Sequence, residues 1–209
     1  MTTTGTALLS NLGKILNDPD GDIWDSDLKV SFVNEALNMI ALLRPDATAV
    51  TASLELTADT PKQVIPATGV RLLDVTRNIA GRPIRRITRE LLNDSVPGWT
   101  IEETATAIEH FMFDAENPKG FFVYPMPSTT LSVEIIYSDT PATFTAASGN
   151  IGISETFLSP VMDYVLYRCL SMHTEGADFG RADGYLNALY TALGVKAKND
   201  AALMQVQGA

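Results

Sequence analysis

The residues of this chain that come closest to a chemical motif are five aspartates, spaced two or three positions apart: Asp18, Asp20, Asp22, Asp25 and Asp27. An EF-hand calcium loop needs oxygen ligands at positions 1, 3 and 5, glycine at position 6 and glutamate at position 12. Counted from Asp18, the sixth residue is Ile23 and the twelfth is Lys29. Because the sharp turn and the bidentate ligand are both missing, we expect a solvated turn and a helix N-terminus, where carboxylates interact favourably with the helix dipole.

Candidates for nucleophilic or metal chemistry are few, because the chain has two histidines and one cysteine. His110 and His173 belong to no HExxH motif, and with one distant cysteine they make a poor metal set. Cys169 and His173 stand at i and i+4 of a predicted helix, where they could form a Cys–His pair. Since Cys169 falls in the apolar stripe of that helix, while a reactive thiol needs an accessible, electropositive setting, we expect it to serve packing.

Paired carboxylates could serve a glycosidase, and the sequence offers four candidates in one region: Glu102, Glu103, Glu109 and Asp114. Glutamates are so common in this acidic chain that they carry little information without geometry. The sequence contains no glycine-rich phosphate loop and no GxSxG motif. We therefore expect a protein that is not an enzyme and uses no metal or cofactor, with a cell-wall hydrolase kept as an alternative.

Arginine is concentrated in one part of the chain. Six of its 15 basic residues lie within 19 positions, and none of the six is lysine: Arg71, Arg77, Arg82, Arg85, Arg86 and Arg89. Arginine pairs with carboxylates in a bidentate manner, which suits contact with a protein partner. A solvated strand-and-loop face would carry the same residues, so both interpretations stay open. Complementary basic and acidic patches would help acidic subunits to close head to tail into a ring.

The net charge of -10 over 209 residues argues against several functions. Reading of a DNA sequence is disfavoured, because duplex binding depends mainly on Lys and Arg that neutralise phosphates. Docking on an anionic membrane is disfavoured for the same reason. The N-terminus lacks the basic region of a signal peptide, and no apolar run approaches the length of a membrane span. With a single cysteine, the sequence indicates a soluble protein made in a reducing cytoplasm.

Hydrophobic periodicity predicts helices at both ends of the chain. The first zone runs from about Thr6 to Arg44: one helix is predicted to end near Asn17, and a second to begin after an N-cap at Asp25 or Ser26 and to end at Pro45. In the last zone, Ser159-Pro160 is typical of an N-cap followed by proline at the first helical position. Gly194 is well placed to end the final helix, and residues after Lys198 lack a sustained period.

The middle of the chain changes to the period of strands. Residues 50–56 and 131–137 alternate between apolar and polar side chains, and three shorter runs are rich in β-branched and aromatic residues: 70–75, 108–113 and 121–124. Frequent turn-formers between the runs favour a small antiparallel sandwich or barrel. A single helical turn is expected at 89–93.

The fold class predicted from these patterns is α+β. N- and C-terminal helices pack as a helical bundle, and a central antiparallel β-rich domain, like a sandwich or barrel, is inserted between them. The predicted boundaries are 1–48 for the N-terminal helices, 49–150 for the β-rich domain, 151–197 for the C-terminal helices and 198–209 for a flexible tail.

Several short strings, in order along the chain, resemble the head-to-tail adaptor (connector) proteins of short-tailed bacteriophages, the group that includes tail tubular protein A. Toward the N-terminus they are Trp24, Asn34-Glu35-Ala36 and Arg44-Pro45-Asp46-Ala47. In the middle they are Arg71-Leu72-Leu73, Val75-Thr76-Arg77-Asn78, Pro97-Gly98-Trp99, Phe111-Met112-Phe113-Asp114, Phe122-Val123-Tyr124-Pro125 and Val133-Glu134-Ile135-Ile136-Tyr137. Toward the C-terminus they are Asp163-Tyr164-Val165-Leu166-Tyr167-Arg168 and Arg181-Ala182. The resemblance covers roughly residues 6–196 and rests on the order and spacing of these strings.

The resemblance implies a structural protein of the virion, assembled in the host cytoplasm. Such subunits form a ring of about twelve copies between the portal protein and the tail nozzle protein, through which double-stranded DNA passes without sequence specificity. For the interface we single out Arg77, Arg82, Arg85, Arg86, Arg89, Trp24 and Trp99. In such adaptors a C-terminal extension often reaches the portal, and the matching positions here are Lys198, Leu203, Met204, Val206 and Ala209. The main alternative is a tail completion or terminator ring protein, and a host-cell binding module is a third possibility.

Overall fold

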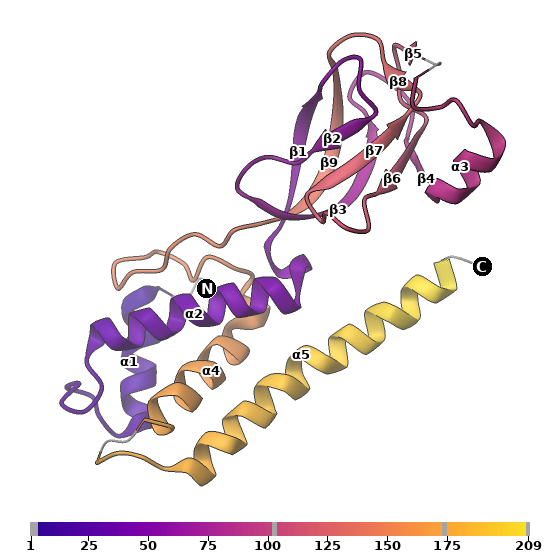
Figure 1. The fold of residues 1–209 in the computed structure, drawn as a ribbon. Helices are drawn as coiled ribbons and strands as arrows, with labels where there is room; N and C mark the ends of the chain where they lie inside the picture. The colour runs from indigo at the N-terminus through magenta and orange to yellow at the C-terminus, as the bar shows by residue number, and fades with distance from the viewer. Residues whose placement is uncertain (1–3, 102–103, 173–174, 208–209) are drawn as a thin grey trace. The chain divides into compact units, whose positions relative to one another are not determined.

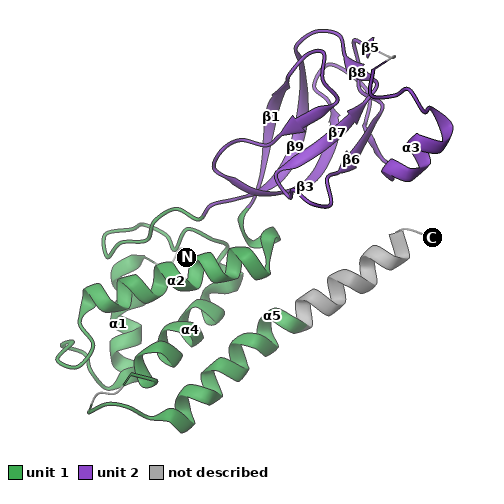
Figure 2. Cartoon of the chain, viewed as in Figure 1, with its two compact units in different colours: residues 1–48, 141–209 green, residues 49–140 purple. Residues whose placement is uncertain are grey.

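The structure is a computed structural model that describes residues 4–101, 104–172 and 175–207, with side chains described as far as residue 194. The fold is α+β, with five α-helices and nine strands in the described residues (Figure 1). The chain forms two compact units, coloured separately in Figure 2. Residues 1–48 and 141–209 make a helical unit, and residues 49–140 make a strand-rich unit. No described helix is both long and apolar enough to cross a bilayer.

The first two helices begin and end where the sequence predicts. Helix α1 spans Gly5–Leu16 and ends on Asn17, whose φ of 57° is left-handed. Helix α2 spans Ser26–Leu43 and is capped by Asp25, whose carboxylate accepts the Leu28 N–H at 2.7 Å. The 3₁₀ turn η1, Pro45–Thr48, follows α2. The caps and the proline therefore carry the information that defines these helix ends.

The C-terminal helices differ from the prediction at two ends. Helix α4 spans Leu158–Leu170 and follows the 3₁₀ turn η2, Glu155–Phe157, so it starts before Ser159 and without a side-chain cap. The N–H groups of a helix's first turn have no partner within the helix, so proline, which lacks an N–H, fits anywhere in that turn. Pro160 therefore allows the helix to start at Leu158. Helix α5 spans Phe179–Gln207, so the predicted helix end at Gly194 is wrong, and the helix continues into the segment predicted as a flexible tail. A helix tolerates an interior glycine at a cost of about 1 kcal/mol, and the alanines and lysines that follow favour helix.

One hydrophobic core holds the helical unit together. Helices α1, α2, α4 and α5 all contribute buried side chains to it, among them Leu12, Ile40, Val165 and Leu189. Phe144 also lies in this core, and its backbone N–H and C=O both bond to the side chain of Asn34 in α2. This is why the strand-rich unit ends at Thr140 rather than at the predicted residue 150.

The first sheet of the strand-rich unit has the order β1-β9-β3 and is antiparallel. Its strands are β1 (Ala49–Leu56), β9 (Leu131–Asp139) and β3 (Gly69–Asn78). Register shifts interrupt the pairing of β3 three times, so its burial repeats every three residues instead of every two. The bulges turn every third residue of β3, starting at Arg71, toward solvent.

The second sheet has the order β2-β7-β6-β4. Its strands are β2 (Lys62–Val64), β7 (Gly120–Tyr124), β6 (His110–Phe113) and β4 (Arg85–Arg86). A two-stranded pair joins β5 (Thr104–Ala105) to β8 (Met126–Pro127). The longer strand pairs are antiparallel, as predicted, but β4–β6 and β5–β8 are parallel, so the domain is mixed. The two-residue strand β4 enters its sheet from a loop, and no hairpin dictates its direction.

A core of apolar residues from both larger sheets fills the strand-rich unit, with Phe111 and Phe121 among its fully buried members. A second, smaller cluster lies under helix α3, Arg89–Ser95, which Thr88 caps through the Leu91 N–H. It contains Leu92, Trp99 and Met112. The helical turn predicted at 89–93 is therefore present and covers one end of the second sheet.

Candidate functional site

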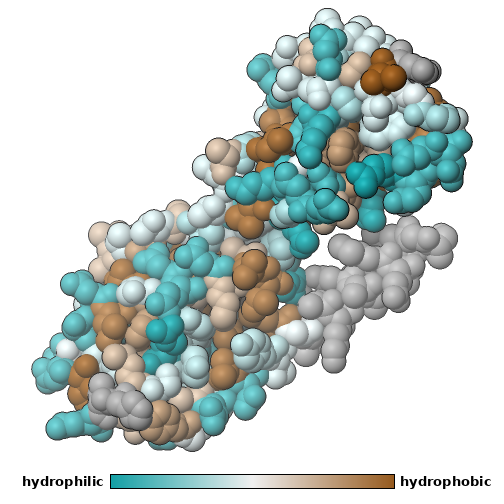
Figure 3. Space-filling model, in the orientation of Figure 1, coloured by the Kyte–Doolittle hydropathy of each residue, from teal (hydrophilic) through white to brown (hydrophobic). Residues whose placement is uncertain are grey.

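All six arginines of the 71–89 stretch are exposed, and three different elements position them. The bulged strand β3 presents Arg71 and Arg77, strand β4 carries Arg85 and Arg86, and Arg89 opens α3. The remaining arginine, Arg82, lies in the loop between β3 and β4. In the space-filling view the visible face of this unit is largely hydrophilic, with apolar residues scattered over it (Figure 3).

Arg77 is held within the chain. Its guanidinium forms two hydrogen bonds to Glu134 of β9, at 3.3 Å from Nε and 3.0 Å from an Nη atom. The Thr76 hydroxyl donates to the same carboxylate at 2.8 Å. The hydrogen bond from Arg77, followed by that from Thr76, lowers the pKa of Glu134. Arg77 therefore has a partner already, although half of its side chain stays exposed.

Arg86 and Arg89 lie over aromatic rings of the second sheet. The Arg86 guanidinium is 5.2 Å from the centre of the Phe113 ring, and that of Arg89 is 5.7 Å from the centre of Phe122. Lys62 approaches the Phe122 ring at 5.6 Å. Cation–π contacts of this kind orient the side chains and leave their charges exposed.

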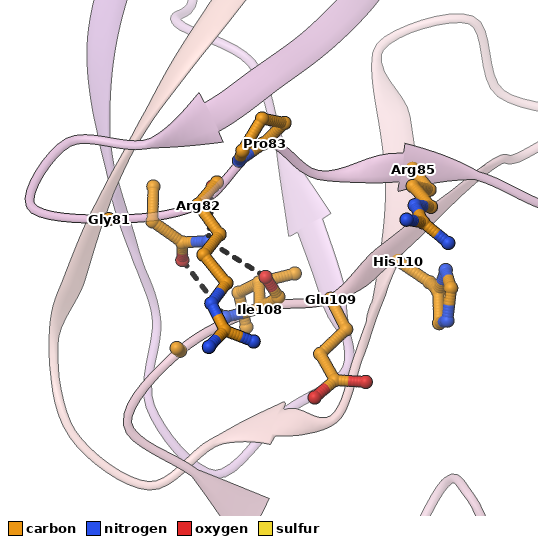
Figure 4. A pocket seen from close by; sticks show the side chains of 9 residues that line it. Gly81, Arg82, Pro83, Arg85, Ile108, Glu109 and His110 are labelled. Carbon is orange, nitrogen blue, oxygen red and sulfur yellow. Dashed lines mark hydrogen bonds between the residues drawn. The ribbon is translucent and has the colours of Figure 1, made fainter.

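Arg82 and Arg85 line an open pocket of about 530 Å³ (Figure 4). The pocket is formed by Asn78, Gly81, Arg82, Pro83, Arg85, Ala107, Ile108, Glu109 and His110. The buried side chain of Asn78 holds the walls of the pocket together. It donates to the carbonyls of Arg82 at 3.1 Å and Ile108 at 2.8 Å, and it accepts the Ile108 N–H at 2.9 Å. The hydrogen bonds of Asn78 thus tie the β3–β4 loop to the segment that precedes β6.

His110 contributes the one aromatic ring of this pocket. It is paired in register with Arg85, and its ring stacks on Tyr124 at 6.3 Å with an interplanar angle of 11°. Its Nδ1 atom is buried and has no hydrogen-bond partner among the described residues. A buried polar nitrogen without a partner is unusual, and the His110 ring that carries it lies beside Arg85 (Figure 4).

The groups predicted as possible catalytic or metal residues are dispersed. Cys169 is fully buried, and burial raises the pKa of its thiol to about 12. Asp114 forms an ion pair with Lys62 at 3.1 Å, and this hydrogen bond lowers the pKa of Asp114. Glu102, Glu103 and His173 lie outside the described residues. Within the described ranges, no three His, Cys, Asp or Glu side chains are placed to share a metal ion.

The aspartates of residues 18–27 divide into one buried and four exposed carboxylates. Asp18 is buried, contrary to the expectation of a solvated turn, because it accepts N–H bonds from Asp22 at 2.8 Å, Ile23 at 3.4 Å and Trp24 at 3.0 Å. Asp25 caps α2, as the pattern predicts. The loop is therefore shaped by one carboxylate and displays the others to solvent.

Both tryptophans assigned to the interface are buried inside the chain itself. Trp24 is 1% exposed in the helical core, and Gly176 lies so close that a Cβ there would be 2.1 Å from the indole. Trp99 is 3% exposed under α3, where its indole N–H donates to Asn93 at 2.8 Å. The sequence around a single tryptophan does not show whether its side chain packs in the core or lies at an interface. Here both tryptophan side chains belong to the hydrophobic core.

The positions predicted to dock on the portal fall on α5. Its helical backbone includes Lys198, Leu203, Met204 and Val206, whose side chains lie outside the described part of the chain. Ala209 lies outside the described residues altogether.

Sequence reasoning found the arginines but missed the pocket that joins two of them to Asn78 and His110. The parallel pairing of β4 with β6 brings these residues together, and no local pattern predicts that pairing. An isolated asparagine at the end of a strand is the only signal the sequence offers, and it is a weak one.

A search among curated proteins found no match to the chain. A family model described as SU10 adaptor protein matches residues 3–208, nearly the whole length. This agrees with the phage adaptor resemblance in the strings from Trp24 to Arg181-Ala182. The chain belongs to the SU10 adaptor protein family, a family of phage head-to-tail adaptors.

Proposed function

We propose that this chain is the subunit of a ring-shaped adaptor in the neck of the virion, between the portal protein and the tail nozzle. About twelve copies form the ring, and genomic double-stranded DNA passes through it without sequence-specific contact. The observation that carries the proposal is the family match over residues 3–208. The protein has a structural role and catalyses no reaction.

The distribution of charge supports a passage for DNA. Both units are acidic, with 7 basic against 13 acidic residues in the helical unit and 8 against 12 in the strand-rich unit. A wall of negative charge avoids the phosphate contacts that would slow DNA. Where the chain does display cations, they are grouped on one stretch of the strand-rich unit, which suits contacts with acidic protein surfaces.

Two of the groups that could have supplied catalysis, Cys169 and Asp114, are in settings that do not favour it. The thiol of Cys169 is buried with a raised pKa, so it carries no thiolate at neutral pH. Asp114 is engaged with Lys62. A zymogram on cell-wall material tests this part of the proposal: clearing that disappears when Glu109 is replaced would establish a hydrolase.

The mass of the purified protein in solution, alone and then with the portal ring, tests the proposal as a whole. We expect chains of 22.6 kDa to be retained on the portal as a ring of many copies. A protein that never associates with the portal under assembly conditions would contradict the adaptor function.

A further inference from the structure

Among the described residues, three of the six arginines, Arg71, Arg82 and Arg85, form no side-chain ion pair or ring contact, and two of these share a pocket. Arg77 is paired with Glu134, while Arg86 and Arg89 lie over aromatic rings. Arg82 and Arg85 form no side-chain ion pair or ring contact in the described part of the chain, and both line the same pocket. Exposed guanidinium groups that share a hollow surface, instead of a flat one, indicate a place for a ligand.

The chemistry of the pocket selects the kind of ligand. Two guanidinium groups offer hydrogen-bond donors to an anion, and the His110 ring lies beside Arg85 in the same lining. Glu109 adds one negative charge to the same lining. A pocket with this balance suits one or two carboxylates of a protein segment.

The pocket is already formed in the free chain. The Asn78 side chain makes three hydrogen bonds and is buried, and the backbone N–H of Arg85 donates to Glu109 at 2.9 Å. Its volume of about 530 Å³ accommodates a few residues of a peptide segment. Because little has to be ordered on binding, even a small contact can contribute to assembly.

A matching segment is present on the helical unit of the same chain. Asp20 and Asp22 are exposed on the loop before α2, and Asp18 holds this loop through three backbone N–H groups. Gly176 packs on Trp24, so the segment that carries exposed Glu175 lies beside the loop and adds to its negative charge. The loop therefore presents the Asp20 and Asp22 carboxylates to solvent, while the one ammonium that lies against it among the described residues, that of Lys29, is buried.

We propose that the pocket between Arg82 and Arg85 of one copy receives the Asp20–Asp22 loop of a neighbouring copy. The contact joins two different surfaces, as a head-to-tail interface in a closed ring requires. The inference rests on the proposed adaptor function and specifies which residues join adjacent subunits.

Reciprocal charge reversal tests the contact. Full-length R82E/R85E, D20K/D22K and the four-fold combination are each added to the portal ring, and the retained copies are counted by mass. We expect each double variant to reduce retention roughly tenfold or more, and the combination to recover most of it, because opposite charges meet again. R71E/K119E is the matched control, since it reverses two exposed cations of the same unit outside the pocket.

Several outcomes would overturn the inference. Full retention of either double variant on the portal, or no recovery of retention in the four-fold combination, would show that the proposed contact does not form. If R82E/R85E lowers affinity for DNA while D20K/D22K assembles normally, the pocket faces the DNA instead. If the unaltered chain fails to bind the portal, the adaptor function itself is wrong, whereas normal binding without charge rescue rejects only this contact.

Cysteine cross-linking gives an independent measurement. Gly81 lies at the pocket and a Cβ there would meet only the Asn78 Cβ, at 3.6 Å, so Gly81→Cys is accommodated. The native Cys169 is buried and does not compete. After oxidation by oxidised glutathione on the portal, we expect G81C/D22C chains to form a disulfide-linked ladder, and neither single variant to extend beyond dimers. Absence of the ladder from assembled rings would contradict the contact.

Discussion

Residues 18–25 in the helical unit and residues 78–85 in the strand-rich unit are two loops that a single buried side chain organises. In the first, the Asp18 carboxylate accepts three backbone N–H groups. In the second, the Asn78 carboxamide donates to two carbonyls and accepts one N–H. The first loop closes over Trp24, which fills its interior, while the second leaves a pocket open to solvent.

Each loop is held by three hydrogen bonds of one buried side chain, yet one loop becomes part of the core and the other lines a pocket. A loop that places a large apolar side chain inward becomes part of the hydrophobic core. In the second loop the inward apolar side chain is Ile84, which joins the strand-rich core, and Gly81, Arg82 and Pro83 place none in the pocket, so its space stays available. The side chains that hold the two loops differ in charge because their partners differ. The Asp18 carboxylate only accepts hydrogen bonds and faces N–H groups, whereas the neutral Asn78 amide can both donate and accept and faces carbonyls and an N–H.

The largest expected effect on stability comes from removing the Trp24 side chain, which fills the first loop. Trp24→Ala should lower the free energy of unfolding of the helical unit by about 4 kcal/mol, because a fully buried indole leaves a cavity. Urea unfolding followed by circular dichroism measures it. Leu42→Ala is the control, since Leu42 is 71% exposed in the same unit and should change little. Equal stability of the two variants would show that Trp24 is not a core residue.

Asn78→Asp should have the next largest effect. The substitution keeps the shape of the side chain but places a carboxylate against the carbonyls of Arg82 and Ile108, which now face it without a donor. We expect a loss of about 3 kcal/mol from the stability of the strand-rich unit. Trp99 fluorescence in a Trp24→Phe background reports on this unit alone. Unfolding at the same urea concentration as the parent would mean that the carboxamide does not organise the loop.

The reciprocal change, Asp18→Asn, should cost less, about 1 to 2 kcal/mol. An amide oxygen still accepts from some of the three N–H groups, although the charge that strengthens these bonds is gone. Trp24 fluorescence during urea unfolding, in a Trp99→Phe background, measures the helical unit. If Asp18→Asn proves more damaging than Asn78→Asp, the comparison of the two loops is wrong in its ranking.

The two loops should also differ in their response to acid. Hydrogen bonds from the backbone, that of Trp24 foremost, hold the pKa of Asp18 below its ordinary value of 3.8. A carboxyl whose pKa is lower in the folded state stabilises the fold above the unfolded value, and this contribution is lost as pH falls through the folded value. Unfolding of the helical unit at pH 6 and pH 3 should therefore show an acid loss that is smaller in Asp18→Asn. An identical loss in both proteins would assign the acid sensitivity to other carboxyls.

The smallest expected effect is at the paired arginine. Arg77→Ala should change the stability of the strand-rich unit very little, because half of the side chain is exposed and surface ion pairs contribute little. Arg71→Ala, which removes an exposed arginine from the same strand, is the matched control. Chemical unfolding at low and high salt measures both. A loss of stability in Arg77→Ala that clearly exceeds that of Arg71→Ala would show that the Arg77–Glu134 pair stabilises the sheet.

Local patterns predicted the parts of the fold that local interactions control. Asn17, Asp25 and Pro45 define the ends of the first two helices, and the alternation in 50–56 and 131–137 corresponds to β1 and β9. Strand β3 could not be described by alternation, since its bulges depend on pairing with β9, far away in the chain. The two tryptophans were misassigned for a related reason, because burial depends on what packs against a side chain.

The sequence by itself determined the α+β composition, the acidic charge with its one arginine-rich stretch, and the family, because these are sums over residues or ordered local strings. Only the tertiary structure decided which arginines are engaged and which line a pocket. That division follows from the parallel pairing of β4 with β6 and from the Asn78 contacts across 30 residues of chain. Contacts between distant segments depend on the whole packed unit, so no local pattern encodes them.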